Sequence, residues 1–265
     1  MMTTKTQQNN SKTIVFDTET SGLFGKSNNP TNIDIFNLQV EDFYIYYKEI
    51  GDVLMSYPRI LQLSFLVYDY SVNQLQCGEY YIQKPRDYKI NSFITKLTNI
   101  DNKILIRKGV SITDALENFI NEYQQANDII SHNISFDYKV VVSEIVRIII
   151  DNIQQDNLIF DINKWIYYYD VITSQEFLNK HYCTMKNTLR LCNIVRINKN
   201  GVQFIKFPKL CELYEFLFGE KCKNMHDSFC DCFCCLRCYY MIKYNVDLYN
   251  DNKVVRVFFK LNNNI

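Results

Sequence analysis

The feature that most constrains the fold is a short apolar run that ends in alternating carboxylates. Residues 13–16 are apolar and rich in β-branched side chains, which predicts a buried strand that continues through Asp17 and Glu19 and turns near Gly22. Alternate side chains of a strand point the same way, so the two carboxylates project together. Adjacent carboxylates repel one another unless a cation lies between them, and oxygen ligands suit Mg²⁺ or Mn²⁺. The strand is therefore expected to end either in solvent or at a metal site.

Further apolar segments predict a sheet around this strand. Pro58 precedes a β-rich run over 59–68, turn residues follow at 71–74, and alternation over 75–83 predicts the second half of a hairpin. A short apolar segment at 128–130 predicts another buried strand. We therefore expect an α/β fold with three antiparallel strands.

Helical spacing of apolar residues predicts the flanking helices. The segments concerned are 113–123, 135–148, 160–169, 185–193, 208–217 and 227–244. A short strand is predicted at 182–184, and the alternating tail Val254–Leu261 predicts an edge strand. The segment 24–57 shows no sustained period and is interpreted as an insertion.

Charge and apolar runs exclude several classes of protein. Lys plus Arg total 29, as do Asp plus Glu, so no overall positive field holds nucleic acid and any polyanion must be bound locally. No long uncharged apolar stretch or secretory signal is evident. We expect a protein that is intracellular, cytoplasmic or nuclear, not secreted and without membrane contact, and its ten cysteines are expected to be free thiols.

One basic stretch stands out from this neutral background. Both an ordinary solvated surface and a strip that binds a nucleic-acid backbone are open interpretations of it. Its cations are Lys186, Arg190, Arg196, Lys199, Lys206 and Lys209.

A cysteine cluster lies near the C-terminal end. Its Cys-x-x-Cys spacings suggest zinc, but all its members lie on one predicted helix and cannot converge as tetrahedral ligands do. We interpret them as small apolar packing residues. They are Cys230, Cys232, Cys234, Cys235 and Cys238.

Two further acidic positions could join the first pair. Asp137 follows the strand 128–130 in the first turn of a helix, where the helix dipole alone would favour a carboxylate. His226 and Asp231 flank another helix start, with Asp227 as its cap. Each position has an ordinary explanation, but one metal site would explain all of them together.

Three segments carry a resemblance to a known family. Residues 16–23, 131–137 and 226–231 resemble the ordered motifs of the DEDDh (DnaQ-like) 3′→5′ exonucleases. Residues 207–219 and 58–62 are similar to DNA-directed members. The resemblance implies an RNase H-like fold: a mixed five-stranded sheet, three antiparallel strands followed by parallel ones, flanked by helices. It covers most of the chain.

This resemblance also suggests how the chain is divided. Residues 1–12 are expected to form a flexible tail, and residues 13–247 an exonuclease domain carrying the insertion at about 24–57. Residues 248–265 would form a C-terminal extension.

The resemblance implies roles for the site residues. Asp17 would bridge two Mg²⁺ (or Mn²⁺) ions, Glu19 and Asp231 would hold the ion that binds the attacking water, and Asp137 would serve the other. His226 would be the general base. Nucleoside 5′-monophosphates would leave a DNA 3′ end one at a time. By the same analogy, the substrate would be contacted by Thr18, Thr20, Leu23, Asn133 and Phe136.

Two alternatives remain open from the sequence. One is an exoribonuclease that trims RNA 3′ ends with the same site. The other is a non-catalytic module of this fold that binds nucleic acid or docks on a polymerase, although the intact acidic residues argue against it. Any polymerase partner would be a separate polypeptide.

Overall fold

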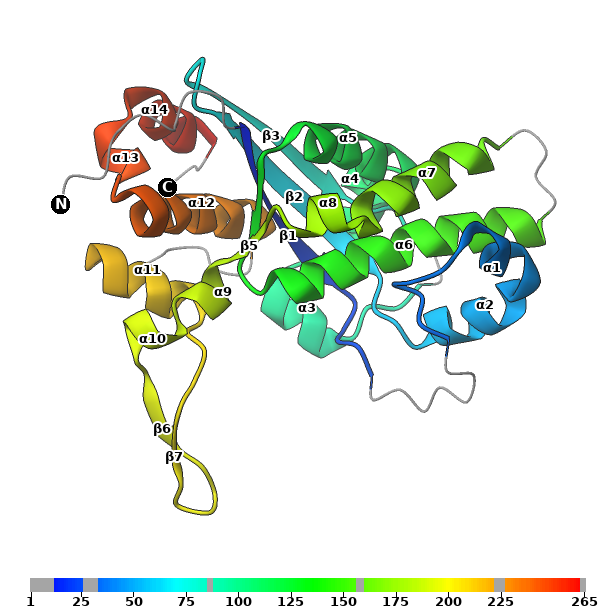
Figure 1. Ribbon diagram of the computed structural model, residues 1–265, viewed down its shortest axis with the longest axis horizontal. Coiled ribbons are helices and arrows are strands. Elements are labelled where there is room, and N and C mark those ends of the chain that lie inside the picture. Colours follow the sequence, from blue (N-terminus) through cyan, green and yellow to red (C-terminus); the bar gives the residue numbers. More distant parts are fainter. Residues whose placement is uncertain (1–11, 26–32, 85–87, 156–159, 222–226, 263–265) are drawn as a thin grey trace.

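A mixed five-stranded sheet in the order β3-β2-β1-β4-β5 organises the structure (Figure 1). The predicted fold class is confirmed, because β3, β2 and β1 are antiparallel neighbours while β4 and β5 run parallel to β1. The computed structural model describes residues 12–25, 33–84, 88–155, 160–221 and 227–262. The strands of the sheet are β1 (Lys12–Thr20), β2 (Ile60–Asp69), β3 (Gln74–Tyr81), β4 (Asp128–Ser131) and β5 (His181–Cys183).

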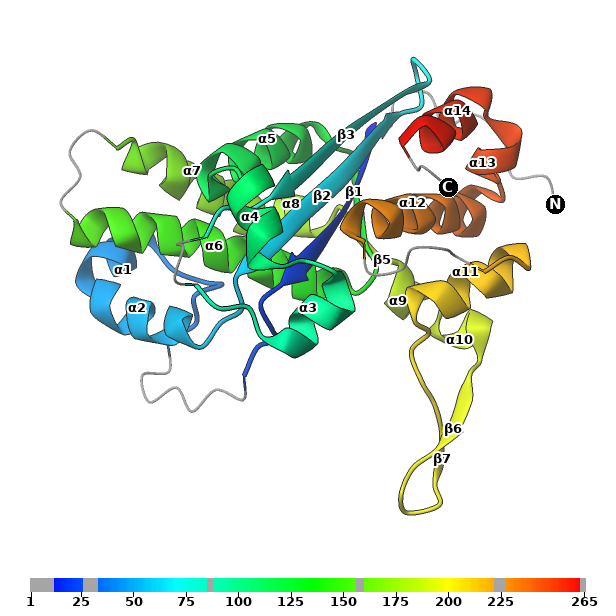
Figure 2. The same ribbon diagram turned by 180° about the vertical axis from the view of Figure 1, so that it is seen from behind.

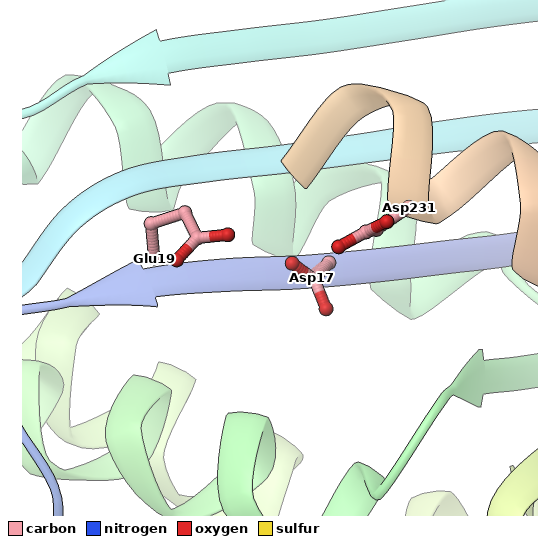
Figure 3. Close-up of side chains that lie close together, drawn as sticks. All are labelled: Asp17, Glu19 and Asp231. Atoms are coloured by element: carbon pink, nitrogen blue, oxygen red, sulfur yellow. The ribbon is translucent and has the colours of Figure 1, made fainter. Parts of the chain in front are cut away.

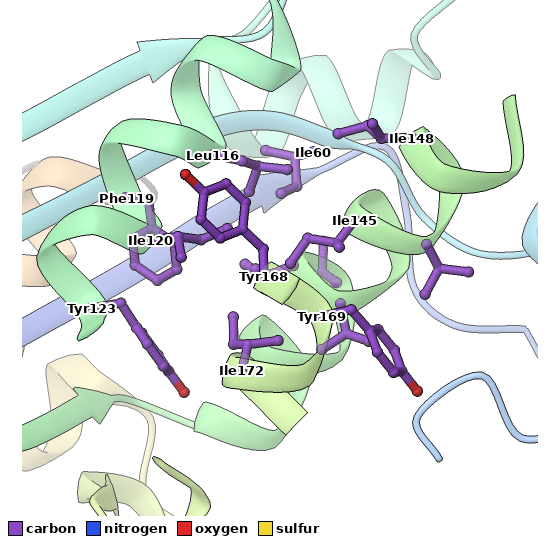
Figure 4. Close-up of a cluster of buried hydrophobic side chains, with 14 of the residues drawn as sticks. Ile60, Leu116, Phe119, Ile120, Tyr123, Ile145, Ile148, Tyr168, Tyr169 and Ile172 are labelled. Atoms are coloured by element: carbon purple, nitrogen blue, oxygen red, sulfur yellow. The ribbon is translucent and has the colours of Figure 1, made fainter. Parts of the chain in front are cut away.

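Strand β1 is the centre of the sheet and separates two apolar cores. Ile14 and Phe16 point into the larger core, whereas Val15 points into the other. The larger core is covered by three helices, α5 (Ile112–Gln125), α6 (Ile134–Gln154) and α7 (Ile162–Thr173), whose aromatic and branched side chains interlock in Figure 4. Because both faces of β1 are buried, its backbone and the side chains that end it are held in fixed positions.

Helix α12 (Ser228–Tyr244) covers the second face of the sheet. Every side chain from Ser228 to Tyr240 is buried, as expected for a helix enclosed by protein on all sides. Helix α11 (Leu210–Phe218) packs on it and ends at Gly219, whose positive φ of 66° suits a glycine. Helices α13 (Leu248–Asp251) and α14 (Lys253–Asn262) follow α12 in the chain.

The segments without a clear sequence period also form defined elements. The insertion contains α1 (Val40–Ile45) and α2 (Tyr47–Met55), which pack against α6. After β3 come α3 (Ser92–Thr98) and α4 (Asn102–Lys108), and α8 (Gln175–Leu178) precedes β5. No helix in the described part of the chain is long and apolar enough to cross a bilayer.

A two-stranded ribbon projects from the body between α10 and α11 (Figures 1 and 2). It consists of β6 (Val195–Ile197) and β7 (Gln203–Ile205). The helix predicted over 185–193 is two short helices, α9 (Thr184–Asn187) and α10 (Leu189–Cys192), interrupted at Thr188. The Thr188 hydroxyl donates to the carbonyl of Thr184 (2.7 Å), a side-chain bond that competes with regular helix geometry.

The prediction of an edge strand at Val254–Leu261 is wrong, because these residues lie in helix α14. Val255 is fully buried, and Phe258 and Phe259, three and four positions later, pack on the same core. That spacing matches a helical face. The same run also alternates between apolar and polar residues, so the sequence fits both a helix and a strand.

The prediction of free thiols needs one correction. Eight described cysteines are free, whereas Cys234 is disulfide-bonded. The prediction rested on the expected reducing compartment, and sequence alone does not reveal which sulfur atoms approach one another.

Candidate functional site

Three carboxylates meet between the end of β1 and the start of α12 (Figure 3). Asp17 and Glu19 extend from the same side of β1, as their spacing predicts, and Asp231 reaches them from the first turn of α12. One oxygen atom from each lies within 4.8 Å of the other two. The structure therefore brings together residues that are more than two hundred positions apart.

Specific contacts hold the start of α12 over the strands. Asp17 pairs with Ser64 of β2, and the hydroxyl of Ser64 lies 2.6 Å from that of Ser228. The predicted cap is confirmed, since Asp227 Oδ1 accepts hydrogen bonds from the backbone N–H groups of Phe229 and Cys230, both 3.1 Å. These contacts place the next turn of the helix, and Asp231 with it, beside β1.

Asp137 approaches the same strand from helix α6 on the other face. Its Oδ1 accepts hydrogen bonds from the backbone N–H (3.0 Å) and the hydroxyl (2.8 Å) of Thr18, and its Oδ2 accepts one from Ser131 (2.8 Å). It is not among the three residues whose oxygen atoms cluster. Its charge nevertheless raises the pKa of Asp17, so all four acids share one electrostatic environment.

The pKa values of these acids show that the site favours bound positive charge. Burial, followed by repulsion from Asp137, Asp231 and Glu19, holds the pKa of Asp17 well above its ordinary value. Burial, followed by repulsion from Asp231, Asp137 and Asp227, raises the pKa of Glu19 to about 8. For Asp137, burial raises the pKa to about 6 although hydrogen bonds from Ser131 and Thr18 oppose the shift. A cation would relieve this repulsion.

The donor set fits a hard divalent cation. All the clustered ligand atoms are carboxylate oxygens, which Mg²⁺ and Mn²⁺ prefer over nitrogen or sulfur. Asp17, Glu19 and Asp231 would hold such an ion directly.

The raised pKa of Glu19 predicts how stability depends on pH without metal. Because the folded state retains a proton that the unfolded chain has lost, the free energy of unfolding decreases as pH rises toward about 8. With EDTA at about pH 8.5, the Glu19→Gln variant should melt about 5 °C above the wild type, and the difference should shrink toward pH 6. Comparing the two proteins cancels the titration of groups outside the acidic cluster. A difference that is absent, or that grows as pH falls, would refute the assignment.

The residues predicted to contact the substrate differ in exposure and in their hydrogen bonds. Leu23 is 80% exposed beyond the end of β1, and Phe136 is half-buried with its ring edge against Phe24 (5.6 Å between centroids). Thr20 is buried and donates to the carbonyl of Gly22, 2.7 Å away. Asn133 begins α6 with a positive φ of 74°. The hydroxyl of Thr18 is committed to Asp137, so its observed role is to hold that acid.

The predicted base, His226, lies outside the described residues, as does most of the predicted tail. The other two histidines are partly buried, and this burial lowers the pKa of both His132 and His181 to about 4. His132 lies between Thr184 and Pro208, and the ring of His181 lies 2.7 Å from the hydroxyl of Tyr123. Both rings are therefore neutral packing groups near pH 7.

Sequence reasoning missed two polar residues beside the acids. Gln62 pairs with Glu19 in the β1–β2 register, and its amide donates to Glu79 Oε1 (3.1 Å). Glu79 pairs with Ser64, so it continues the row that begins at Asp17. The alternation of β3 places Glu79 on one face, but only the register shows that this is the face of the site.

Comparisons with known proteins bear on the family and the fold of this chain. The family model described as exonuclease (RNase T) matches residues 14–239. Among solved structures, E. coli Exonuclease I in complex with a dT13 oligonucleotide is 15% identical, with a TM-score of 0.52 over 91% of this chain and 42% of that one. Another structure of exonuclease I is 16% identical, with a TM-score of 0.51 over 96% and 44%. The chain thus spans less than half the length of these structures. No curated protein matches significantly.

Proposed function

The chain belongs to the exonuclease family, and from that premise we propose that it is a metal-dependent 3′→5′ exonuclease that releases nucleoside 5′-monophosphates from DNA. The observation that supports this most is the meeting of Asp17, Glu19 and Asp231 within 4.8 Å. Family membership gives the class of reaction, and the cluster supplies the means to perform it.

The proposed division of labour follows from where each acid lies. Asp17, at the centre, would bind both of two Mg²⁺ or Mn²⁺ ions, with Glu19 and Asp231 on one of them and Asp137 on the other. When bound, the ions would stabilise charge on the entering and leaving oxygen atoms of the phosphodiester. Thr18 and Ser131 would keep the Asp137 carboxylate oriented by their hydrogen bonds.

The proton of the attacking water needs an acceptor near pH 7. We assign this role to His226, which immediately precedes the cap residue Asp227. Neutral imidazole has a suitable ordinary pKa of about 6.5. His132 and His181 are unsuitable because their pKa values of about 4 make them weak bases.

The substrate is proposed to be the 3′ end of single-stranded or frayed DNA. Exposed Leu23 and half-buried Phe136 offer apolar contacts to the terminal nucleotide that do not depend on base identity. E. coli Exonuclease I, which shares this fold, was crystallised with a dT13 oligonucleotide, so single-stranded DNA is the natural first substrate to test.

A side-by-side digest tests this proposal. Single-stranded, matched and mismatched DNA and single-stranded RNA, all labelled at the 5′ end, would be incubated with Mg²⁺ or Mn²⁺ and with EDTA. We expect single-stranded DNA to shorten stepwise from the 3′ end only when metal is present. Internal cuts, or equal shortening in EDTA, would contradict the proposal, and faster loss of RNA would favour the trimming of RNA ends.

A further inference from the structure

The segment that carries the ribbon has an extreme charge bias in a neutral chain. Between Glu176 and Glu212 the sequence contains seven Lys or Arg residues and no acid. Lys206 pairs with Glu212 (2.6 Å). In the part of the chain that the structure describes, ion pairs are not found for the exposed residues Lys186, Arg190, Arg196 and Lys199. The segment therefore presents a surplus of positive charge to solvent, although Glu212 also feels the charge of Arg196.

Apolar side chains are exposed beside these cations. Both strands of the ribbon are exposed along their whole length. Phe204 is 46% exposed and Ile197 65% exposed. The ribbon projects away from the body in both views (Figures 1 and 2).

The register of the ribbon separates its two faces. Arg196 pairs directly with Phe204, so the guanidinium and the aromatic ring share one face. Val195 pairs with Ile205, and these aliphatic residues lie on the opposite face together with Ile197. One face thus combines a cation with an aromatic ring, which is the combination that binds single-stranded nucleic acid by phosphate contact and base stacking.

The base of the ribbon is fixed beside the candidate active site. The backbone carbonyl of Pro208, which follows β7, lies 3.1 Å from His132 Nε2, and the hydroxyl of Thr184, before β6, lies 2.9 Å from Nδ1. Since a carbonyl only accepts, Nε2 carries the proton and Nδ1 accepts from Thr184. His132 adjoins Asn133 and the helix that carries Asp137. Both ends of the segment are therefore tied to the loop that leads into the site.

We propose that the Arg196–Phe204 face of the ribbon binds the single strand whose 3′ end occupies the active site. This inference rests on the proposed exonuclease function and adds a surface for the nucleotides that have not yet been cleaved. Arg196 and Lys199 contact phosphates, and Phe204 stacks on a base. The ribbon raises affinity for long strands without taking part in hydrolysis.

Binding and catalysis can be tested separately. Fluorescence anisotropy in EDTA measures affinity for a labelled DNA strand of about 20 nucleotides. The double variant Arg196→Glu/Lys199→Glu should raise Kd about tenfold at about 0.1 M salt and reduce the salt-dependence slope by about 1.4, which corresponds to two lost phosphate contacts. Phe204→Ala should raise Kd about fivefold.

Two matched variants serve as controls. Lys253→Glu/Lys260→Glu changes net charge equally on α14, which lies on the far side of α12 from the ribbon (Figure 1), and Ile197→Thr alters the aliphatic face. Both should bind like the wild type. Equal losses in both charge-reversal variants, unchanged binding in the ribbon variants, or a loss with Ile197→Thr but not with Phe204→Ala would overturn the proposal.

A small substrate separates this inference from the proposed function. Hydrolysis of the p-nitrophenyl ester of thymidine 5′-monophosphate, which is too short to reach the ribbon, should proceed equally in the wild type and the ribbon variants. If the wild type hydrolyses neither the ester nor DNA, the exonuclease proposal fails, while the anisotropy result still decides whether the ribbon binds nucleic acid. A ribbon variant that loses activity on the ester would contradict its assignment as a binding surface alone.

Discussion

Replacing Asp17 with alanine is expected to lower the rate of 3′-end hydrolysis by about 10³–10⁴. Asp17 is the central acid: it shares the cluster with Glu19 and Asp231, and its pKa is raised by Asp137 as well. Its removal would take away the one ligand proposed to serve both ions. The measurement is single-turnover cleavage of labelled single-stranded DNA with saturating Mn²⁺.

The same variant should not lose stability when metal is absent. Burial and four neighbouring carboxylates disfavour ionised Asp17, so its removal relieves repulsion, and the melting temperature in EDTA near pH 8 should equal or exceed that of the wild type. Asp52→Ala, at an exposed carboxylate of α2, is the matched control and should cleave normally. An Asp17→Ala protein that cleaves at the wild-type rate would show that hydrolysis occurs elsewhere.

Replacing His226 with alanine is expected to slow hydrolysis by about 10²–10⁴ while leaving metal affinity nearly unchanged. A general base removes a proton but does not hold the ions, so turnover and metal binding should separate. In the wild type, activity should fall as pH drops below about 6.5, where imidazole becomes protonated. With Mn²⁺ saturating at every pH, so that the acids stay ionised, that decline should be absent from the variant.

The two other histidines provide the control for this assignment. His132 and His181 have pKa values lowered to about 4 by burial, so neither produces a pH dependence near 6.5. His181→Gln, which keeps a polar group near Tyr123, should retain the wild-type pH profile. A normal rate in His226→Ala would remove the residue from the mechanism, and loss of metal affinity would make it a ligand instead of a base.

The sheet was predictable where local pattern and burial agree. The β1 run, the hairpin of β2 and β3, and the short strand before Asp137 are apolar segments bounded by turn residues, and all are strands in the structure. The prediction for the tail failed because Val254–Leu261 fits both the strand period and the helical period. Packing of Val255 and Phe259 on the core selects the helix. The ribbon was missed because exposed strands have no buried face to create a pattern.

The sequence predicted which residues form the candidate site, but not how they are arranged in space. The spacing of Asp17 and Glu19 places both on one side of a strand, and the cap at Asp227 places Asp231 in the first turn of α12. Neither pattern states that the two elements touch, which depends on the contact between Ser64 and Ser228. The support that Thr18 gives Asp137 was also hidden, because it joins the end of β1 to a helix that starts over a hundred residues later.

The central claim is that the clustered acids bind divalent metal ions. Its most direct test is a titration with Mn²⁺ in which electron paramagnetic resonance measures the concentration of the free ion. At about pH 8 we expect two bound ions per wild-type chain and a marked loss of binding in Asp17→Asn, which keeps the size of the side chain and removes its charge. Equal binding in the two proteins, or no binding in the wild type, would show that the buried acids do not form a metal site.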